Sequence, residues 1–280
     1  MAVMALAQAI ARHVHDGDSI ALEGFTHLIP FAAGHEIIRQ GRRNLHLIRM
    51  TPDLIYDQMI GMGCAAQLTF SWGGNPGVGS LHRLREAVEK EWPAPLLLHE
   101  HTHAELGIAY QAGAAGLPCG LLRQYAPTDL DRARSGRTLE CPFTGATLRA
   151  VRAVNPDVTI LHAQRADEQG NVLIRGIVGA AREAALAARC VLVTVEELVP
   201  RLEAAPNAII LPHWLVTAVC VVRGGAHPTY AAGCYERDNR FYLAWDEIAR
   251  DRERFQVWMR EYVLDCPDHG ATLRRLGVAE

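Results

Sequence analysis

The chain has 280 residues, of which 49% are apolar and 21% are charged, so it can bury a sizeable core and is not expected to be disordered. Its formal net charge of −3 at pH 7 gives no electrostatic basis for binding nucleic acid or an anionic membrane surface. No apolar run reaches the roughly 18 residues of a transmembrane helix, so no membrane association is expected.

The N-terminus and the cysteines both favour a cytoplasmic protein. The opening sequence MAVMALAQAIARHV has no basic region before its apolar residues, and Arg12, His13 and Asp16 follow at once. This pattern predicts an amphipathic first helix and not a signal peptide. The seven cysteines are scattered and never spaced C-x-x-C, which is typical of free thiols in a reducing compartment.

The sequence up to residue 115 alternates short apolar strands with helices. We expect strands at 19–22, 45–49, 64–70 and 95–99, and helices at 3–14, 30–39, 52–60, 81–91 and 104–115. This alternation predicts right-handed βαβ units and an α/β fold with an open, mostly parallel sheet and helices on both faces. The next segment, from Pro118 to Pro156, is weakly patterned, which is typical of a lid or a partner-contact arm.

The stretch PDVTILHAQRADEQGN, from Pro156 to Asn171, is the feature around which the chain is organised. Residues 157–161 have the pattern of a buried strand, and the residues that follow are mostly polar. An open α/β sheet places its functional groups where a core strand ends in this way. A strand that leaves the core for solvent would show the same pattern.

The remaining sequence predicts more strands and a long helix. We expect strands at 172–174, 190–195, 208–211 and 216–222, a helix at 179–187, and a charged amphipathic helix at 245–264. No internal repeat and no clear boundary divides the sequence, so residues 1–280 are expected to form a single domain.

A glycine-rich loop, WGGNPGVGS, follows one expected strand and precedes a helix. Its glycines and asparagine let backbone N–H groups approach a ligand, and the helix N-terminus adds partial positive charge. The loop lacks the G-x-G-x-x-G register of a dinucleotide site and the Gly-Lys-Ser/Thr of a P-loop. It is therefore either a structural turn or a cradle for a carbonyl, carboxylate or phosphate group.

A second polar cluster, HEHTH, runs from His99 to His103 after an apolar strand. If that strand continues, its period of two places the three histidines on one face and Glu100 on the other. An H-x-H pair can bind zinc, but no second ligand cluster completes a site, and we expect no metal. The alternatives are a polar active-site edge, with Glu100 or His103 in acid–base or orienting roles, and a solvated strand end.

Two further polar features follow strands. Glu23 could act as a nucleophile or base, but capping of the next segment or pairing with a cation is the favoured interpretation. The loop GGAHPT, at 224–229, is a ligand loop or a turn. No G-x-S-x-G elbow and no local signature of a catalytic thiol are present, which argues against a nucleophilic hydrolase.

Together these segments resemble the α (A) subunit of class I CoA-transferases, in particular the glutaconate CoA-transferase type. The similarity spans nearly the whole chain in the order of the family. The matching segments are GFTHLIPFAAGHEIIRQG (24–41), WGGNPGVGSLHRLREAVEKE (72–91), EHTHAELGIAYQAGAAGLP (100–118), PFTGATLRAVRAVNPDVTILHAQRADEQGN (142–171), VTVEELV (193–199) and GGAHPTYAAGCYERD (224–238).

The resemblance implies a NagB/RpiA/CoA-transferase-like fold and an enzyme assembled from α and β subunits, as an αβ heterodimer or its α2β2 double. Family members move CoA between carboxylic acids through a glutamyl-CoA thioester, with coenzyme A as a substrate and no covalently bound cofactor. The reactive glutamate belongs to the β subunit, in a Glu-Asn-Gly or Glu-Gly-Gly context that this chain lacks. The implied substrate-binding residues here are Gly24, Phe25, Thr26, Ser71, Gly74, Asn75, Gly77, Val78 and Gly79.

The chain departs from the family pattern at two places. Glu23 stands where the α subunit usually reads Gly-Gly-Phe, and His101 and His103 stand where many relatives read Glu-aromatic-Ser/Thr-Asn. One branch of the family hydrolyses a cyclic ketone CoA thioester with an acidic residue of the α subunit, and Glu100 would match that residue. The alternative function is therefore a ring-opening CoA-thioester hydrolase with Glu100 as base. A sugar-phosphate-binding domain is disfavoured because no lysine cluster is present.

Overall fold

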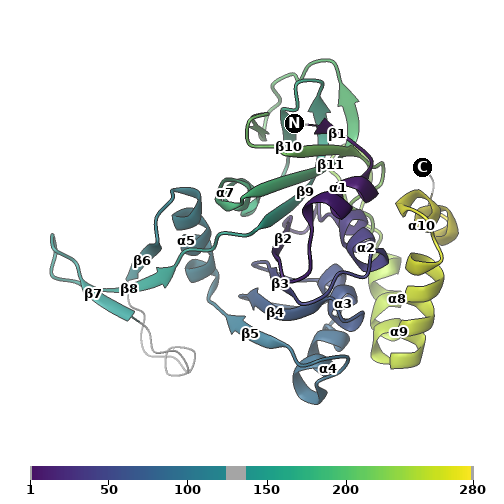
Figure 1. Cartoon of the computed structure of the whole chain (residues 1–280), viewed down its shortest axis with the longest axis horizontal. Helices are drawn as coiled ribbons and strands as arrows, with labels where there is room; N and C mark the ends of the chain where they lie inside the picture. The colour runs from purple at the N-terminus through teal and green to yellow at the C-terminus, as the bar shows by residue number, and fades with distance from the viewer. Residues whose placement is uncertain (1, 124–136, 279–280) are drawn as a thin grey trace.

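The computed structural model describes residues 2–123 and 137–278. Its main feature is a ten-stranded sheet whose principal order is β1-β13-β11-β9-β2-β3-β4-β5 (Figure 1). These strands are β1 Ala2–Val3, β2 Ser19–Glu23, β3 Leu45–Ile48, β4 Ala65–Phe70, β5 Leu97–Glu100, β9 Val158–Asp167, β11 Cys190–Val199 and β13 Ala218–Val221. All neighbours along this path are parallel. The predicted α/β class is confirmed.

Helices cover both faces of the sheet, as expected for a parallel sheet whose two faces are apolar (Figure 1). The helices on the larger side are α1 Leu6–His13, α2 Phe31–Arg39, α3 Leu54–Gly61, α4 His82–Lys90, α8 Asn239–Arg250, α9 Arg252–Met259, the π-helical turn η1 Arg260–Leu264 and α10 His269–Leu276. Helices α5 His103–Ala114 and α7 Ala181–Ala187 cover the other face.

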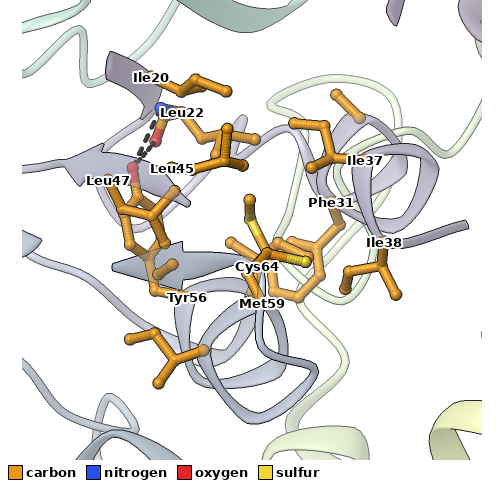
Figure 2. Close-up of a cluster of buried hydrophobic side chains, with 14 of the residues drawn as sticks. Ile20, Leu22, Phe31, Ile37, Ile38, Leu45, Leu47, Tyr56, Met59 and Cys64 are labelled. Carbon is orange, nitrogen blue, oxygen red and sulfur yellow. Dashed lines mark hydrogen bonds between the residues drawn. The ribbon is translucent and has the colours of Figure 1, made fainter. Parts of the chain in front are cut away.

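The largest apolar cluster lies between the sheet and the helices of the larger side (Figure 2). Alternation along β2 decides which side each residue faces: Ile20 and Leu22 join this cluster, whereas Ala21 packs under α5 and α7. The hydroxyl of Tyr56 donates to the carbonyl of Ile48 and accepts from the N–H of Leu22, which ties α3 to the edge of the sheet. None of the helices in the described ranges has the length and hydrophobicity needed to cross a lipid bilayer.

The central strand is longer than the sequence predicted. Strand β9 does not end at Leu161 but continues through the polar residues to Asp167. Its continuation pairs in parallel with the end of β11 and antiparallel with β10 Val172–Arg175, which in turn pairs with β12 Ala208–Leu211. Polar residues remain in a strand here because neighbours on both sides satisfy its backbone groups.

The expected helix over 245–264 is wrong in its extent and continuity. Helix α8 already begins at Asn239 and ends at Arg250, and α9 begins at Arg252. The intervening Asp251 has an extended backbone, with φ −104° and ψ 130°, and its side chain accepts a hydrogen bond from the N–H of Arg254 at 2.8 Å. An aspartate can cap a helix N-terminus in this way. A new helix therefore begins after Asp251, although the apolar periodicity of the sequence shows no interruption there.

The described part of the weakly patterned segment forms a small antiparallel sheet with the order β6-β8-β7. Its strands are β6 Cys119–Arg123, β7 Arg137–Glu140 and β8 Thr147–Arg152, and the rest of the expected arm, 124–136, lies outside the described residues. We call residues 137–152 the β7–β8 hairpin. It projects away from the body of the molecule (Figure 1). All four residues of β7 are exposed.

Candidate active site

The predicted site residues meet at the carboxyl edge of the parallel sheet. Gly24 follows β2, Ser71 follows β4, and Glu100 is the last residue of β5. Phe70 and Glu100 are register partners, and the N–H of His101 donates to the carbonyl of Phe70 at 2.7 Å. The carboxyl edge of an open α/β sheet is the usual place for a ligand site. The fold therefore brings the Gly24 loop, Ser71 and Glu100 to one edge.

The loop after β2, residues 24–28, is held in a strained conformation. A Cβ atom at Gly24 would lie 2.7 Å from the carbonyl oxygen of Leu28 and 2.8 Å from that of His27, so only glycine fits. Thr26 and Leu28 have φ values of 62° and 53°, in the left-handed region that non-glycine residues seldom adopt. Strain of this kind persists only where the surrounding structure enforces it, and it is common at functional sites.

A buried ionic cluster beneath this loop holds it in the strained conformation. Arg49, at 1% exposure, donates from Nη2 to the carbonyl of Gly24 at 2.8 Å and from Nη1 to Oδ1 of Asp53 at 3.1 Å. Glu23 is also buried, and Oε1 of its carboxylate accepts from the hydroxyl of Tyr110 at 2.7 Å. Burial raises the pKa of Glu23, although the nearby Arg49 charge and Tyr110 oppose the shift.

This geometry favours pairing over nucleophilic chemistry for Glu23. Its carboxylate faces Tyr110 and the Arg49 charge inside the protein, and its exposure is only 3%. The cluster also orients the peptide after Gly24. Because the peptide bond is planar and trans, fixing the Gly24 carbonyl toward Arg49 points the Phe25 N–H away from the buried cluster. That N–H is the candidate hydrogen-bond donor of the loop.

In the second glycine-rich loop, residues 71–80, several backbone N–H groups donate to carbonyl groups of the loop itself. The N–H of Asn75 donates to the carbonyl of Gly79 at 2.8 Å, and the N–H groups of Val78 and Gly79 both donate to the carbonyl of Asn75. The Asn75 side chain is buried and donates to the carbonyl of Tyr242 at 2.9 Å. These bonds are those of a structural turn. Substrate contact through Asn75, Val78 and Gly79 stays a prediction.

Among the remaining predicted residues of this loop, Gly74 and Gly77 determine its conformation, and Ser71 lies at the edge of the sheet. A Cβ at Gly74 would lie 2.7 Å from the ring of Trp72, and Gly77 has a φ of +80°. Ser71 donates from Oγ to the carbonyl of Met50 at 2.7 Å, which joins the ends of β3 and β4. Ser71 is the member of this loop that lies directly at the carboxyl edge.

The three histidines of the HEHTH cluster do not share one strand face, because the strand does not continue beyond Glu100. Thr102 caps α5 instead: its Oγ1 accepts from the N–H of Glu105, and Glu105 Oε2 accepts from the N–H of Thr102. His103 is therefore the exposed first residue of a helix and not a third histidine on the strand face. The period-two extrapolation failed because a capping box overrode the strand pattern.

The other histidines of the cluster lie on the α5 face of the sheet. His99 lies beside His46, with ring centroids 5.4 Å apart and ring planes tilted by 52°, and its Nε2 is 2.9 Å from Oε1 of Gln67. His46, His99 and His101 line a cavity of about 660 Å³. Burial and the neighbouring His99 lower the pKa of His46 to about 4. Within residues 2–123 and 137–278, no group of three or more His, Cys, Asp or Glu side chains is arranged to hold a metal ion.

A network that the sequence did not reveal joins β9 and β11 to the 224–229 loop. His162 places Nδ1 2.8 Å from Oγ1 of Thr194 and Nε2 2.6 Å from Oε1 of Glu196. Glu196 also accepts from the Tyr235 hydroxyl and from the N–H of Gly224. Burial alone would raise the pKa of Glu196, but these hydrogen bonds outweigh it and the pKa lies below its ordinary value. His162 therefore has a structural partner.

Arg49, Asp53 and Tyr110 are the site residues that sequence reasoning missed. One signal was present, because the strand pattern LHLIR ends in a charged residue at the same edge as Glu23. Of the partners of Arg49, Gly24 follows β2 and Asp53 directly precedes α3, whereas Tyr110 lies in α5. Only the tertiary structure shows that they meet.

Comparison with known proteins shows extensive similarity. The family model described as Coenzyme A transferase matches residues 3–221. The α (A) subunit of 3-oxoadipate CoA-transferase from Pseudomonas knackmussii is 60% identical over 95% of this chain and 95% of that protein. The α (A) subunit of glutaconate CoA-transferase from Acidaminococcus fermentans is 31% identical over 98% of this chain and 92% of that protein.

Structural similarity agrees with these matches. The crystal structure of glutaconate coenzyme A-transferase from Acidaminococcus fermentans matches with a TM-score of 0.89, covering 99% of this chain and 93% of that one. The cholesterol ring-cleaving hydrolase IpdA subunit of Rhodococcus jostii is more distant, at 28% identity over 56% of this chain and 57% of that protein. The chain belongs to the coenzyme A transferase family, as an α (A) subunit of the class I type.

Proposed function

We propose that this chain is the α subunit of an enzyme that moves CoA between an acyl-CoA and a dicarboxylic acid, with 3-oxoadipate as the leading candidate. The observation that carries this proposal is the 60% identity, over nearly the full length of both chains, to the α (A) subunit of a 3-oxoadipate CoA-transferase. The reactive glutamate belongs to a β subunit.

We also propose a cytoplasmic location, because all seven cysteines are free thiols.

The reaction has two matching halves. In the first, the β-subunit glutamate takes CoA from the acyl-CoA and releases the first acid, which leaves a glutamyl-CoA thioester. In the second, the accepting acid takes CoA from that thioester and frees the glutamate. Each half places negative charge on a carbonyl oxygen at its transition state, and dividing the transfer in two lowers the barrier of each step.

The contribution of this chain is a preorganised donor beside that oxygen. The Phe25 N–H is turned away from the buried cluster, and the strained backbone at Thr26 and Leu28 keeps the loop in one conformation. A fixed N–H donor stabilises developing negative charge without reorganising during the reaction. Ser71 and Glu100, at the same edge, complete the proposed acyl side of the cleft.

The test is to trap the thioester. The chain is co-purified with its β subunit, incubated with succinyl-CoA, treated with borohydride and analysed by mass spectrometry of each subunit. We expect the modified glutamate on the β subunit, and no CoA transfer by the α subunit purified alone as the control. Modification of this chain, or turnover by the isolated chain, contradicts the assignment.

A second candidate function is supported by two observations. Glu100 is exposed at the carboxyl edge, and the chain shares 28% identity over 56% of its length with a protein named cholesterol ring-cleaving hydrolase IpdA subunit. As a base, Glu100 would activate water for a ring-opening hydrolysis. In that case Glu100→Gln abolishes the hydrolysis of a cyclic ketone CoA thioester. In a transferase, the same variant leaves the trapping of the β-subunit thioester intact.

A further inference from the structure

The basic groups that converge on one cavity are the strongest feature outside the candidate active site. The cavity has a volume of about 430 Å³ and lies beside β9 and β10. Arg165, Arg175 and Arg201 all line it, and all three are exposed to solvent. Three guanidinium groups around one hollow are suited to an anion, because each offers a planar fork of N–H donors.

Opposing charges compensate only part of this positive charge. Arg165 is paired with Glu197, with Nε 2.9 Å from Oε2, and Glu203 also lines the cavity. Among the described residues, the guanidinium groups of Arg175 and Arg201 have no hydrogen bond or ion pair. The guanidinium group of Arg175 lies close to Gly233: a Cβ atom on Gly233 would be 3.8 Å from Nη1 of Arg175. Arg175 and Arg201 are therefore available to a ligand.

The arginine cavity adjoins a second hollow that reaches the Gly24 loop at His27. That second hollow, of about 560 Å³, is lined by His27, Gly176 and Tyr230, and it shares Ala232 with the arginine cavity. The backbone between the two is firmly held: the carbonyl of Arg175 lies 3.1 Å from Nε2 of His27 and accepts from Nε2 of Gln164 at 3.0 Å. We call these two adjoining hollows the groove, which lies between His27 of the Gly24 loop and the side chains of Arg175 and Arg201.

Coenzyme A matches this groove in its chemistry. Its thiol end must reach the acyl site, a long flexible arm follows, and its far end carries phosphate groups. We propose that the arginine cavity binds the phosphate groups of CoA through Arg175 and Arg201, while the hollow beside His27 takes the arm. This inference rests on the proposed transferase function. The other anion of the reaction is the carboxylate of the acid substrate, and the experiment separates the two.

The experiment uses the co-purified αβ complex and three variants: Arg175→Ala, Arg201→Ala and their combination. Arg254→Ala is the matched control, because Arg254 is an exposed arginine on α9, away from the groove. KM and kcat are measured for succinyl-CoA, for the accepting acid, and for the succinyl thioester of pantetheine, which lacks the nucleotide phosphates. The pantetheine thioester also reports folding, since a misfolded variant would lose activity with it.

We expect each single variant to raise KM for succinyl-CoA about tenfold, because each removes one charge-assisted contact. The double variant should raise this KM further. KM for the acid and kcat/KM for the pantetheine thioester should remain within about twofold of wild type, and Arg254→Ala should change none of the three. A rise in KM for the acid, equal losses with both thioesters, or an unchanged KM for succinyl-CoA would overturn the inference. Absence of transfer by the wild-type complex would instead contradict the proposed function.

Discussion

At the scale of single residues, the site depends on charges buried beneath a loop. Arg49 is the central group, because one guanidinium holds both the Gly24 carbonyl and Asp53. A buried charge that loses its partner costs about 3–5 kcal/mol, so the cluster can impose the strained loop conformation on Thr26 and Leu28. Arg49, which orients the proposed donor, therefore lies beneath the Gly24 loop and not at the reacting groups.

Replacing Arg49 with lysine tests this role. Lysine keeps the charge but cannot hold Gly24 and Asp53 with one fork, so the Phe25 N–H loses its fixed direction. We expect kcat of the complex to fall about 100-fold, with KM for both substrates within about threefold. The matched control is Arg39→Lys, an arginine whose side chain is 9% exposed and pairs with Glu36 on α2. Both variants should lower thermal stability, and a normal kcat in Arg49→Lys would contradict the role.

At the scale of elements, one side chain joins three helices. Asp57 of α3 accepts from the N–H groups of Arg83 and Leu84 at the start of α4, and from Nε1 of Trp245 on α8. Helix α4 is the next helix along the chain and α8 is far from α3 in sequence, and these bonds fix how the three pack together. Asp57 is fully buried, and burial raises its pKa from 3.8 to about 6 despite these hydrogen bonds.

The raised pKa of Asp57 predicts a pH dependence of folding. Between about pH 4 and pH 6 the folded chain binds a proton that the unfolded chain has released, so stability falls as pH rises through this window. The shift of about two pKa units corresponds to about 3 kcal/mol.

The measurement is urea unfolding of wild type and Asp57→Asn from pH 4 to pH 7. Asparagine does not titrate, so the free energy of unfolding of Asp57→Asn should gain about 3 kcal/mol relative to wild type across this range. Asp246→Asn is the control: burial alone would raise the pKa of Asp246, but His82 and Arg250 outweigh it and the pKa is lowered below 3.8, so its titration lies below this pH range and the difference from wild type should stay nearly constant. A pH-independent difference for Asp57→Asn would contradict the prediction.

At the scale of the whole molecule, the β7–β8 hairpin leaves apolar groups uncovered. Phe143 is 92% exposed at its turn, and β7 and the turn project away from the sheet and its helices, whereas β8 packs against α5 through Val151 (Figure 1). An exposed strand edge with apolar side chains beside it is a surface that another chain usually covers. We infer that this hairpin contacts the β subunit in the assembled enzyme.

The prediction for the hairpin is that Phe143→Ser weakens the αβ complex and leaves the α subunit itself intact. The side chain makes little contact within the chain, so the melting temperature of the isolated subunit should change by less than about 2 °C. Dissociation of the complex, measured by analytical ultracentrifugation, should increase at least about tenfold. Leu243→Ser, an exposed residue of α8, is the control. Equal dissociation of both variants and wild type would exclude the hairpin as a contact.

The sequence alone determined the class of fold and the family of this protein. Alternating short strands and helices required a parallel sheet with helices on both faces, and local patterns carry that information because each element buries its own apolar face. The Gly24 loop, Ser71 and Glu100 were also accessible, because side chains that follow parallel strands must meet at one edge.

The tertiary structure alone decided the geometry of the site. The capping box at Thr102 removed His103 from the strand face, and Asp251 divided the long C-terminal helix, because side-chain bonds to the backbone overrode the apolar periodicity. The Arg49 cluster and the arginine groove join residues that are far apart in the chain. Contacts of this kind depend on how the elements pack, so no pattern within a single element could reveal them.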